Sequence, residues 1–185
     1  MYCYKTGLLQ KVKSHLNHGG IIAYPTESCY GLGCNPFNVL AVNKLIKLKS
    51  RNKDKGVIVV ASKKKQLNKL ISPLEILDNP ELNKYWPGAY SLILPTNRRT
   101  PKIVQGRYNK LAVRVSAHTG IQQLCNYLNM PLVSTSANRA GLKSIKTYRE
   151  CVHQFGTDVM VLPGVIGFAK TPSTIIDWGT QQRLR

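Results

Sequence analysis

Acidic residues are scarce in this sequence. The 185 residues include 27 Lys and Arg but 8 Asp and Glu, so the formal net charge is +19 with neutral histidines. Carboxylate-driven hydrolases and cages for hard metal ions need two or more acids that converge on one point. The acids here are scattered, which argues against both classes of site, and the excess of basic residues predicts an anionic partner.

Cysteine pairs and long hydrophobic runs are also lacking. The five cysteines are odd in number and contain no Cys-x-x-Cys pair, which argues against a disulfide framework and a structural zinc site and favours reduced thiols. The N-terminus has no signal-peptide apolar stretch, and the longest aliphatic run, Val57 to Ala61, is far below the ~20 residues of a membrane helix. We therefore expect a soluble, cytoplasmic protein with no membrane contact.

Several well-known catalytic motifs are missing. There is no Gly-x-x-x-x-Gly-Lys-Ser/Thr run and no Gly-x-Gly-x-x-Gly, which disfavours P-loop and Rossmann enzymes. The four histidines have no ligand-like spacing, and no serine lies in a Gly-x-Ser-x-Gly elbow, so a zinc site and a hydrolase triad have little support.

The hydrophobic pattern predicts a single α/β domain over residues 1–185. Hydrophobic residues make up 43% of the chain and charged residues 19%, as in a packed globular protein. Three-to-four spacing and short apolar runs alternate along the chain, and their irregular lengths favour a twisted mixed sheet flanked by helices. Gly31-x-Gly33 is interpreted as a tight loop. The expected helices cover 8–16, 39–48, 118–128 and 147–155, and the expected strands 21–24, 57–60, 90–94, 111–115, 131–133, 159–162 and 174–176.

The densest charge lies between Lys44 and Lys69, where ten basic residues accompany Asp54 alone. Such a run is usually a solvated face. Its middle, from Lys49 to Lys55, falls between a helix and a buried strand, and loops at strand ends are where open α/β sheets bind ligands. Alternating basic side chains there could converge on a polyphosphate.

Two further segments follow strands. Ser134-Thr135-Ser136-Ala137-Asn138 reads either as turn and cap chemistry or as a set of neutral donors and acceptors for phosphate and ribose oxygens. The segment from Tyr24 to Gly33 combines a restrictive proline with small hydroxyls and glycines. Its Glu27 could bind a substrate amine or a metal, or could be a surface acid.

Together these segments resemble the YrdC/TsaC family of threonylcarbamoyl-AMP synthases in its short, bacterial TsaC form. The resemblance runs from about Gly20 to Asp177. It implies a YrdC-like domain with a basic concave cleft. It also implies a nucleotidyltransferase that condenses L-threonine, bicarbonate and ATP to threonylcarbamoyl-AMP and pyrophosphate. The segments that carry it are Tyr24-Pro25-Thr26-Glu27, Lys49-x-Arg51, Trp86-Pro87-Gly88, Leu111-Ala112-Val113-Arg114-Val115 and Ser134-Thr135-Ser136-Ala137-Asn138.

The same resemblance implies roles for individual residues and partners. Mg²⁺ would accompany ATP, and the product would serve the t6A modification of tRNA through proteins of the TsaB, TsaD and TsaE type. This chain has Asn52 and Ala89 where the family commonly has proline. Threonine would be bound by Thr26, Arg114, Ser134 and Ser173, and the nucleotide by Lys49, Arg51, Lys53, Ser136 and Asn138, with Lys49 and Arg51 catalytic.

Two other functions compete with this one. The charge of +19 would also suit a non-catalytic protein that binds tRNA or double-stranded RNA through phosphates, although no RNA-reading signature of the RRM type is present. A related domain of hydrogenase-maturation proteins transfers a carbamoyl group from carbamoyl phosphate, but normally within a much larger chain.

Overall fold

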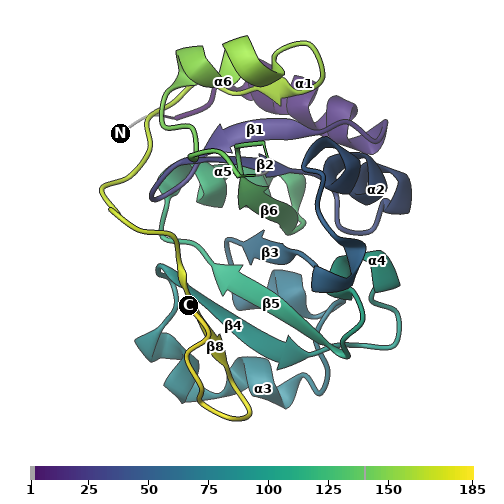
Figure 1. The fold of residues 1–185 in the computed structure, drawn as a ribbon. Coiled ribbons are helices and arrows are strands. Elements are labelled where there is room, and N and C mark those ends of the chain that lie inside the picture. The colour runs from purple at the N-terminus through teal and green to yellow at the C-terminus, as the bar shows by residue number, and fades with distance from the viewer. Residues whose placement is uncertain (1–2, 140) are drawn as a thin grey trace.

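The computed structural model describes residues 3–139 and 141–185 and arranges them around one twisted sheet (Figure 1). Met1, Tyr2 and Ala140, which the expected domain includes, lie outside the described residues. The strand order is β7-β1-β2-β6-β3-β5-β4-β8. In chain order the elements are α1 (Thr6–Asn17), β1 (Ile22–Pro25), β2 (Tyr30–Gly33), α2 (Val39–Leu48), η1 (Lys53–Lys55), β3 (Ile58–Ala61), η2 (Lys64–Leu67), α3 (Glu75–Asp78), η3 (Pro80–Lys84), β4 (Tyr90–Pro95), α4 (Lys102–Gln105), β5 (Lys110–Val115), α5 (Thr119–Leu128), β6 (Leu132–Ser136), α6 (Tyr148–Phe155), β7 (Met160–Val161) and β8 (Thr174–Asp177).

The sheet is mixed, as the irregular element lengths predict. β6 lies at its centre and pairs antiparallel with both β2 and β3. β1 and β2 form an antiparallel pair, as do β4 and β5. Parallel pairs join β1 to β7, β3 to β5 and β4 to β8. The expected α/β class is therefore confirmed.

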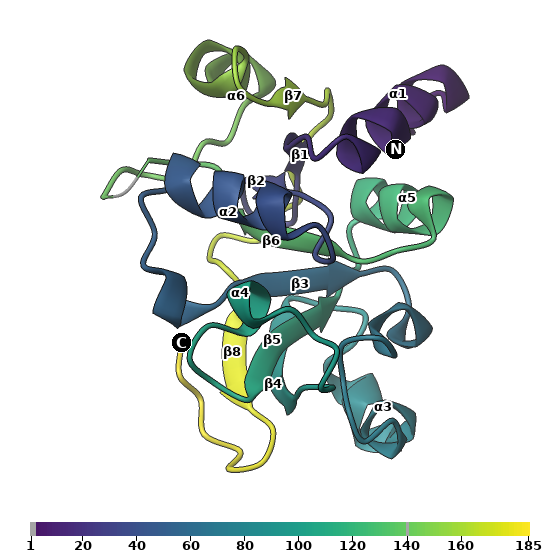
Figure 2. The same cartoon turned by 90° about the vertical axis from the view of Figure 1, so that its right-hand side faces the viewer.

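Alternating strand residues supply two hydrophobic clusters, one on each face of the sheet. Ile21 and Ala23 pack with α2 and α6, whereas Ile22 and Tyr24 pack with α1 and α5. Figure 2 shows α2 on one side of the sheet and α1 and α5 on the other. The helices thus cover both faces around β1, β2 and β6.

Local chemistry fixes where the longer helices begin and end. Asn38 caps α2 by accepting a hydrogen bond from the Ala41 amide at 3.0 Å. α6 starts with a capping box between Thr147 and Glu150, which supplies acceptors to otherwise unpaired amides. α5 ends at Leu128 and is capped by Asn129, whose φ of 50° is left-handed, a conformation that asparagine tolerates well.

The glycines after the first strand are part of the sheet, so the expected tight loop at Gly31-x-Gly33 is wrong. They lie in β2, which pairs with both β1 and β6. A Cβ at Gly33 would lie 2.5 Å from the Val133 carbonyl oxygen and 2.8 Å from the Tyr24 ring. Glycine is needed here for the close approach of neighbouring strands, which a sequence pattern does not distinguish from a turn.

Within the described parts of the chain, no helix combines the length and the apolar character that crossing a membrane requires.

Candidate functional site

A cavity of about 700 Å³ opens on one face of the sheet. It lies on the face that α1 and α5 cover elsewhere: Val60 belongs to the cluster under α5 and also lines the cavity. Because side chains alternate along a strand, every second residue of the neighbouring strands reaches the same floor. These floor residues are Ser134 and Ser136 of β6, Ile58 and Val60 of β3, Ala112 and Arg114 of β5, Ser91 and Ile93 of β4, and Ile175 and Asp177 of β8.

Most of the site residues predicted from the sequence meet in this cavity. Thr26 reaches it from the turn between β1 and β2, where its Oγ1 donates to the Cys29 carbonyl at 2.8 Å. Lys49, Lys53 and Asn138 are not among its lining residues. Lys53 is exposed on η1. The predicted residues that do line it are Thr26, Arg51, Arg114, Ser134, Ser136 and Ser173.

Lys49 is a buried anchor for the chain that follows β6. Its side chain leaves the end of α2, and its Nζ donates to the Ser136 carbonyl at 2.8 Å and to Oδ1 of Asn138 at 2.6 Å, with a third bond to the Asn138 carbonyl. Ser136 Oγ donates to the same Asn138 Oδ1 at 2.7 Å. Burial, with a smaller contribution from the nearby charge of Arg51, lowers the pKa of Lys49 to about 8. Lys49 therefore fixes the position of Ser136, which lines the cavity.

The hydroxyls of this segment lie on a strand, so the strand expected over 131–133 is longer than predicted, and the turn interpretation is wrong for Ser134 to Ser136. β6 continues through Ser136, because Gly31 and Leu32 of β2 pair with Ser136 and Thr135. Ser134 and Ser136 thereby face the cavity from a hydrogen-bonded strand.

Arg51 reaches the cavity from the loop after α2. Its Nε donates to the Gly56 carbonyl at 2.9 Å. Burial lowers the pKa of Arg51, and the neighbouring charge of Arg185 acts in the same direction. Asn52 accepts a hydrogen bond from the Asp54 amide at 2.8 Å and caps η1, so a side-chain turn orders this loop.

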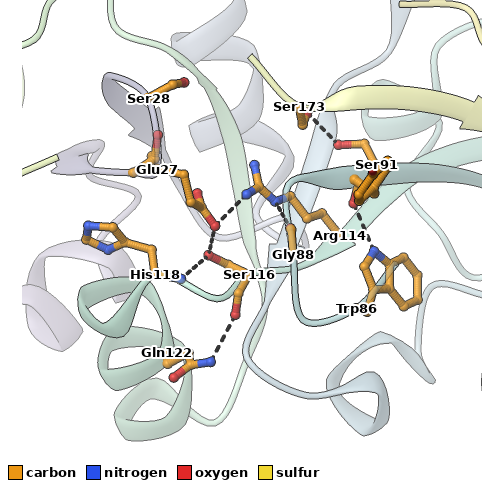
Figure 3. Close-up of polar contacts among 12 residues, drawn as sticks. Glu27, Ser28, Trp86, Gly88, Ser91, Arg114, Ser116, His118, Gln122 and Ser173 are labelled. Carbon is orange, nitrogen blue, oxygen red and sulfur yellow. Dashed lines mark hydrogen bonds and ion pairs between the residues drawn. The ribbon is translucent and has the colours of Figure 1, made fainter. Parts of the chain in front are cut away.

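Arg114 lies on the cavity floor and forms an ion pair with Glu27, so Glu27 is neither a surface acid nor a free group (Figure 3). The Arg114 side chain is 12% exposed, and its Nε donates to the Gly88 carbonyl at 2.7 Å. Glu27 Oε1 also accepts a hydrogen bond from Ser116 Oγ at 2.6 Å. Burial lowers the pKa of Arg114, and the Glu27 carboxylate opposes that effect.

Ser173 and Arg185 complete the wall near β8. Ser173 Oγ is 2.9 Å from Ser91 Oγ, and the guanidinium of Arg185 donates to the Ser173 carbonyl at 3.1 Å. The pattern of the sequence gives no sign of Arg185. Its position arises because Leu184 and Arg185 pair with the backbone of Ile175, which returns the end of the chain to the cavity.

The charges around the cavity suit the binding of an anion. Asp177 is an acid in its lining, and its pairing with Lys110 at 2.9 Å lowers the pKa of the carboxyl group. No group of three or more metal-ligating side chains occurs among residues 3–139 and 141–185. The cavity can therefore position and neutralise anionic groups among hydroxyls, and Asp177 is held as a carboxylate. The cationic lining residues are Arg51, Lys55, Lys110, Arg114 and Arg185.

Comparisons with known proteins give a consistent result. The family model Sua5/YciO/YrdC, described as "Telomere recombination", matches residues 14–185. A threonylcarbamoyl-AMP synthase of Chromobacterium violaceum is 47% identical over 178 residues, covering 96% of this chain and 92% of the relative. A synthase of the same name from Methylobacillus flagellatus is 48% identical over 162 residues, covering 88% of this chain and 90% of its own.

A solved structure shares the fold. The crystal structure of P. abyssi Sua5 complexed with L-threonine matches 96% of this chain with a TM-score of 0.86 and 26% identity. The match covers 53% of the P. abyssi protein, so this chain spans about half of its length.

Proposed function

This chain belongs to the Sua5/YciO/YrdC family, and from that premise we propose that it is a threonylcarbamoyl-AMP synthase. It condenses L-threonine, bicarbonate and ATP to threonylcarbamoyl-AMP and pyrophosphate. The observation that carries this proposal is one cavity in which Arg114 lies among hydroxyls, with Arg51, Lys55 and Arg185 also in its lining. An amino acid presents a carboxylate and ATP presents phosphates, and this lining offers cations to both.

We assign the threonine to the part of the lining that includes Arg114. The guanidinium pairs with the substrate carboxylate in a forked contact. Thr26, Ser134 and Ser173 supply hydroxyls around it. This assignment is supported by the position of all four residues in the same cavity.

We assign the phosphates to Arg51, which lines the cavity directly. Ser136 lines it too, and Lys49 and Asn138 act on the nucleotide through the hydrogen bonds that hold Ser136. Lys53, exposed on η1, adds positive charge near the same loop. We assign the direct charge stabilisation in the reaction to Arg51, and Lys49 contributes to it by holding Ser136 in place.

The proposed chemistry needs positioning more than it needs a base. The threonine amine and bicarbonate form a carbamate and release water, and a carbamate oxygen then attacks the α-phosphorus of ATP while pyrophosphate leaves. Charge accumulates on phosphate oxygens during this step, so fixed cations lower the barrier. A carbamate oxygen is already anionic, so no base has to remove a proton from it before it attacks. In agreement with this, the cavity-lining acid Asp177 is engaged in an ion pair with Lys110.

Mg²⁺ enters this proposal as part of the substrate MgATP. The described residues contain no cluster of three ligating side chains, so phosphate oxygens and water would supply most of its ligands. The protein would contribute the surrounding cations and hydroxyls.

We further propose that the product serves t6A formation on tRNA in the cytoplasm. Threonylcarbamoyl-AMP is a mixed anhydride, so an enzyme that transfers its threonylcarbamoyl group must consume it soon after release. Proteins of the TsaB, TsaD and TsaE type are the proposed consumers. The net charge of +19 supports direct contact with tRNA or double-stranded RNA.

The first test is product formation without RNA. Purified protein is mixed with ATP, Mg²⁺, bicarbonate and L-threonine, quenched rapidly and examined by mass spectrometry. We expect threonylcarbamoyl-AMP that depends on threonine. A folded protein that yields none and still binds RNA would support the RNA-binding function. Thermal stabilisation of the protein by carbamoyl phosphate but not by threonine would support carbamoyl transfer.

A matched pair of variants tests the site. Arg51→Ala removes a cation from the cavity. We expect kcat/KM for ATP to fall by at least about tenfold, because losing one hydrogen bond between charged groups typically reduces affinity by that factor or more. Lys65→Ala removes an exposed cation on η2 outside the cavity and should leave kcat/KM unchanged. Equal activity in both variants would contradict the phosphate assignment.

A further inference from the structure

Glu27 has no part in the reaction described above, although it is one of eight acids in the chain. It lies at the turn between β1 and β2, where its neighbours Thr26 and Ser28 line the main cavity. Glu27 itself lines a second, smaller cavity of about 520 Å³ together with His118. Its side chain is absent from the lining of the main cavity, whereas Arg114 belongs to that lining, so the carboxylate meets Arg114 from outside the substrate cavity. Figure 3 shows this ion pair.

The contacts of Arg114 leave one part of its guanidinium for a ligand. Nε is occupied by the Gly88 carbonyl and Nη2 by Glu27. Among the residues that the structure describes, no hydrogen bond occupies Nη1, and Figure 3 shows this nitrogen without a partner. The two protein contacts fix the plane of the guanidinium. Since Arg114 lines the main cavity, this leaves Nη1 for a substrate bound there.

Glu27 is itself held at both its side chain and its backbone. Ser116 Oγ donates to Oε1 at 2.6 Å and accepts from the His118 amide at 3.0 Å. The amides of Gly167 and Ala169 donate to the Thr26 and Glu27 carbonyls at 2.9 and 3.0 Å. A carboxylate fixed in this way can fix its partner in turn.

Charge gives a second reason for an acid at this position. Arg114 shares the cavity with Arg51, Lys55, Lys110 and Arg185. Burial lowers the pKa of Arg114, and the charge of Arg185 adds a smaller effect in the same direction. An arginine that is largely buried among other cations needs a counter-ion to keep its place. Asp177, an acid in the cavity lining, is paired with Lys110, which leaves Glu27 as the partner for Arg114.

We infer that Glu27 is a positioning residue for recognition of the substrate's α-carboxylate: it orients Arg114 from outside the cavity and touches no substrate atom. The inference rests on the proposed function, in which Arg114 binds the carboxylate of threonine. It accounts for an acid that is held firmly beside a cavity that binds anions, and it excludes a role for Glu27 as a ligand for the substrate amine.

The test compares Glu27→Ala and Glu27→Gln by steady-state kinetics with threonine and ATP varied separately. Glu27→Ala removes both the charge and the acceptor, so we expect KM for threonine to rise about tenfold or more while KM for ATP changes less than about twofold. Glu27→Gln keeps an acceptor oxygen of the same reach for Arg114 and Ser116, and it should recover part of the loss. Glu81→Ala is the matched control, because Glu81 is an exposed acid paired with Lys84, and it should leave both KM values unchanged.

The outcomes separate three roles. An unchanged KM for threonine in folded Glu27→Ala overturns the inference, as does an equal rise in both KM values, which would indicate a general structural role. If Glu27→Ala does not fold, the nearly isosteric Glu27→Gln is judged by the same ratio of KM values. Wild-type protein that forms no threonine-dependent product overturns the proposed function first, and the inference with it.

Discussion

The protonation of Lys49 controls how firmly one part of the cavity lining, at Ser136, is held in place. The ammonium of Lys49 donates to three oxygens of Ser136 and Asn138. Since its pKa is about 8, a rise in pH through that value leaves a neutral amine with two N–H donors for three acceptors. We expect KM for ATP to rise between pH 7 and 9 with a midpoint near 8, and Lys49→Arg, which stays charged, to shift that midpoint to higher pH. A profile that is the same in both proteins would contradict this prediction.

The low pKa of Lys49 also affects the free energy of unfolding. A rise in pH is expected to weaken ATP binding, but it should increase this group's contribution to stability. An unfolded lysine titrates near 10.5 and the folded Lys49 near 8, so between these values the unfolded chain binds more protons. The free energy of unfolding contributed by this group therefore rises with pH from about 8 to 10.5. Burial raises the pKa of Cys34, Cys125 and Cys151, and these thiols titrate in wild type and in Lys49→Met alike. The free energy of unfolding of wild type minus that of Lys49→Met, measured by urea denaturation at each pH, should therefore rise across this window.

Individual site residues differ in how far the sequence reveals them. Arg114 lies between Val113 and Val115, and a charged residue at one position of an apolar strand indicates a face that meets a ligand or solvent. Ser134 and Ser136 are visible for a different reason, because they belong to a run of hydroxyls that directly follows an apolar strand. Arg185 is not, because its place depends on backbone pairing of the chain end with β8, a contact that no local pattern specifies. The sequence leaves the role of Glu27 open, because the pairing of a lone acid is a tertiary property.

At the scale of the element, β2 shows what close packing requires. Gly33→Ala would place its Cβ against the Val133 carbonyl and the Tyr24 ring, and we expect a loss of about 1–3 kcal/mol in the free energy of unfolding. Gly7→Ala is the matched control, since nothing lies within 4 Å of its Cβ, and it should stabilise helix α1 by up to about 1 kcal/mol. Chemical denaturation measures both. A Gly33→Ala protein as stable as wild type would show that β2 and β6 can move apart.

The last segment of the chain acts as one wall of the cavity. Asp177 pairs with Gln182 and Ile175 with Arg185 through the backbone, which brings the Arg185 guanidinium to Ser173. We expect Arg185→Ala to raise KM for ATP by about tenfold, because one cation leaves a site that binds phosphates. Arg98→Ala, at an exposed position outside the lining and far from this segment in the chain, is the control. Similar kinetics for the two variants would remove this segment from the site.

Helices and apolar strands follow from the sequence better than the polar parts of strands do. The spacing of Val42, Leu45 and Ile46 predicts α2, and these side chains are buried in the core. Glycines and hydroxyls are typical of turns, so the sequence predicts loops where β2 and the second half of β6 lie. Their strand geometry comes from pairing between segments about a hundred residues apart, so it is a property of the sheet rather than of either segment.

At the scale of the whole molecule, the net charge exceeds what the cavity uses. Five of the 27 basic residues line the cavity. Other basic residues lie on the surface away from it, such as the exposed Lys63, which precedes η2, and the exposed Lys65 on η2. One small anionic substrate cannot account for this surplus. A polyanion with phosphates spread over a long surface can, since each neutralised phosphate releases a counter-ion.

The surplus predicts binding of tRNA or double-stranded RNA that depends steeply on salt and weakly on sequence. We expect log Kd to rise linearly with log salt concentration between low and physiological ionic strength. A triple variant of Lys63, Lys64 and Lys65 to glutamine should lower that slope by up to about one for each phosphate that is no longer neutralised, while kcat/KM for threonine stays at the wild-type value because none of the three lines the cavity. Fluorescence anisotropy with labelled tRNA and with an unrelated duplex measures the slopes. A flat salt dependence would mean that the charge serves another purpose, and a slope unchanged in the triple variant would place the RNA on a different face.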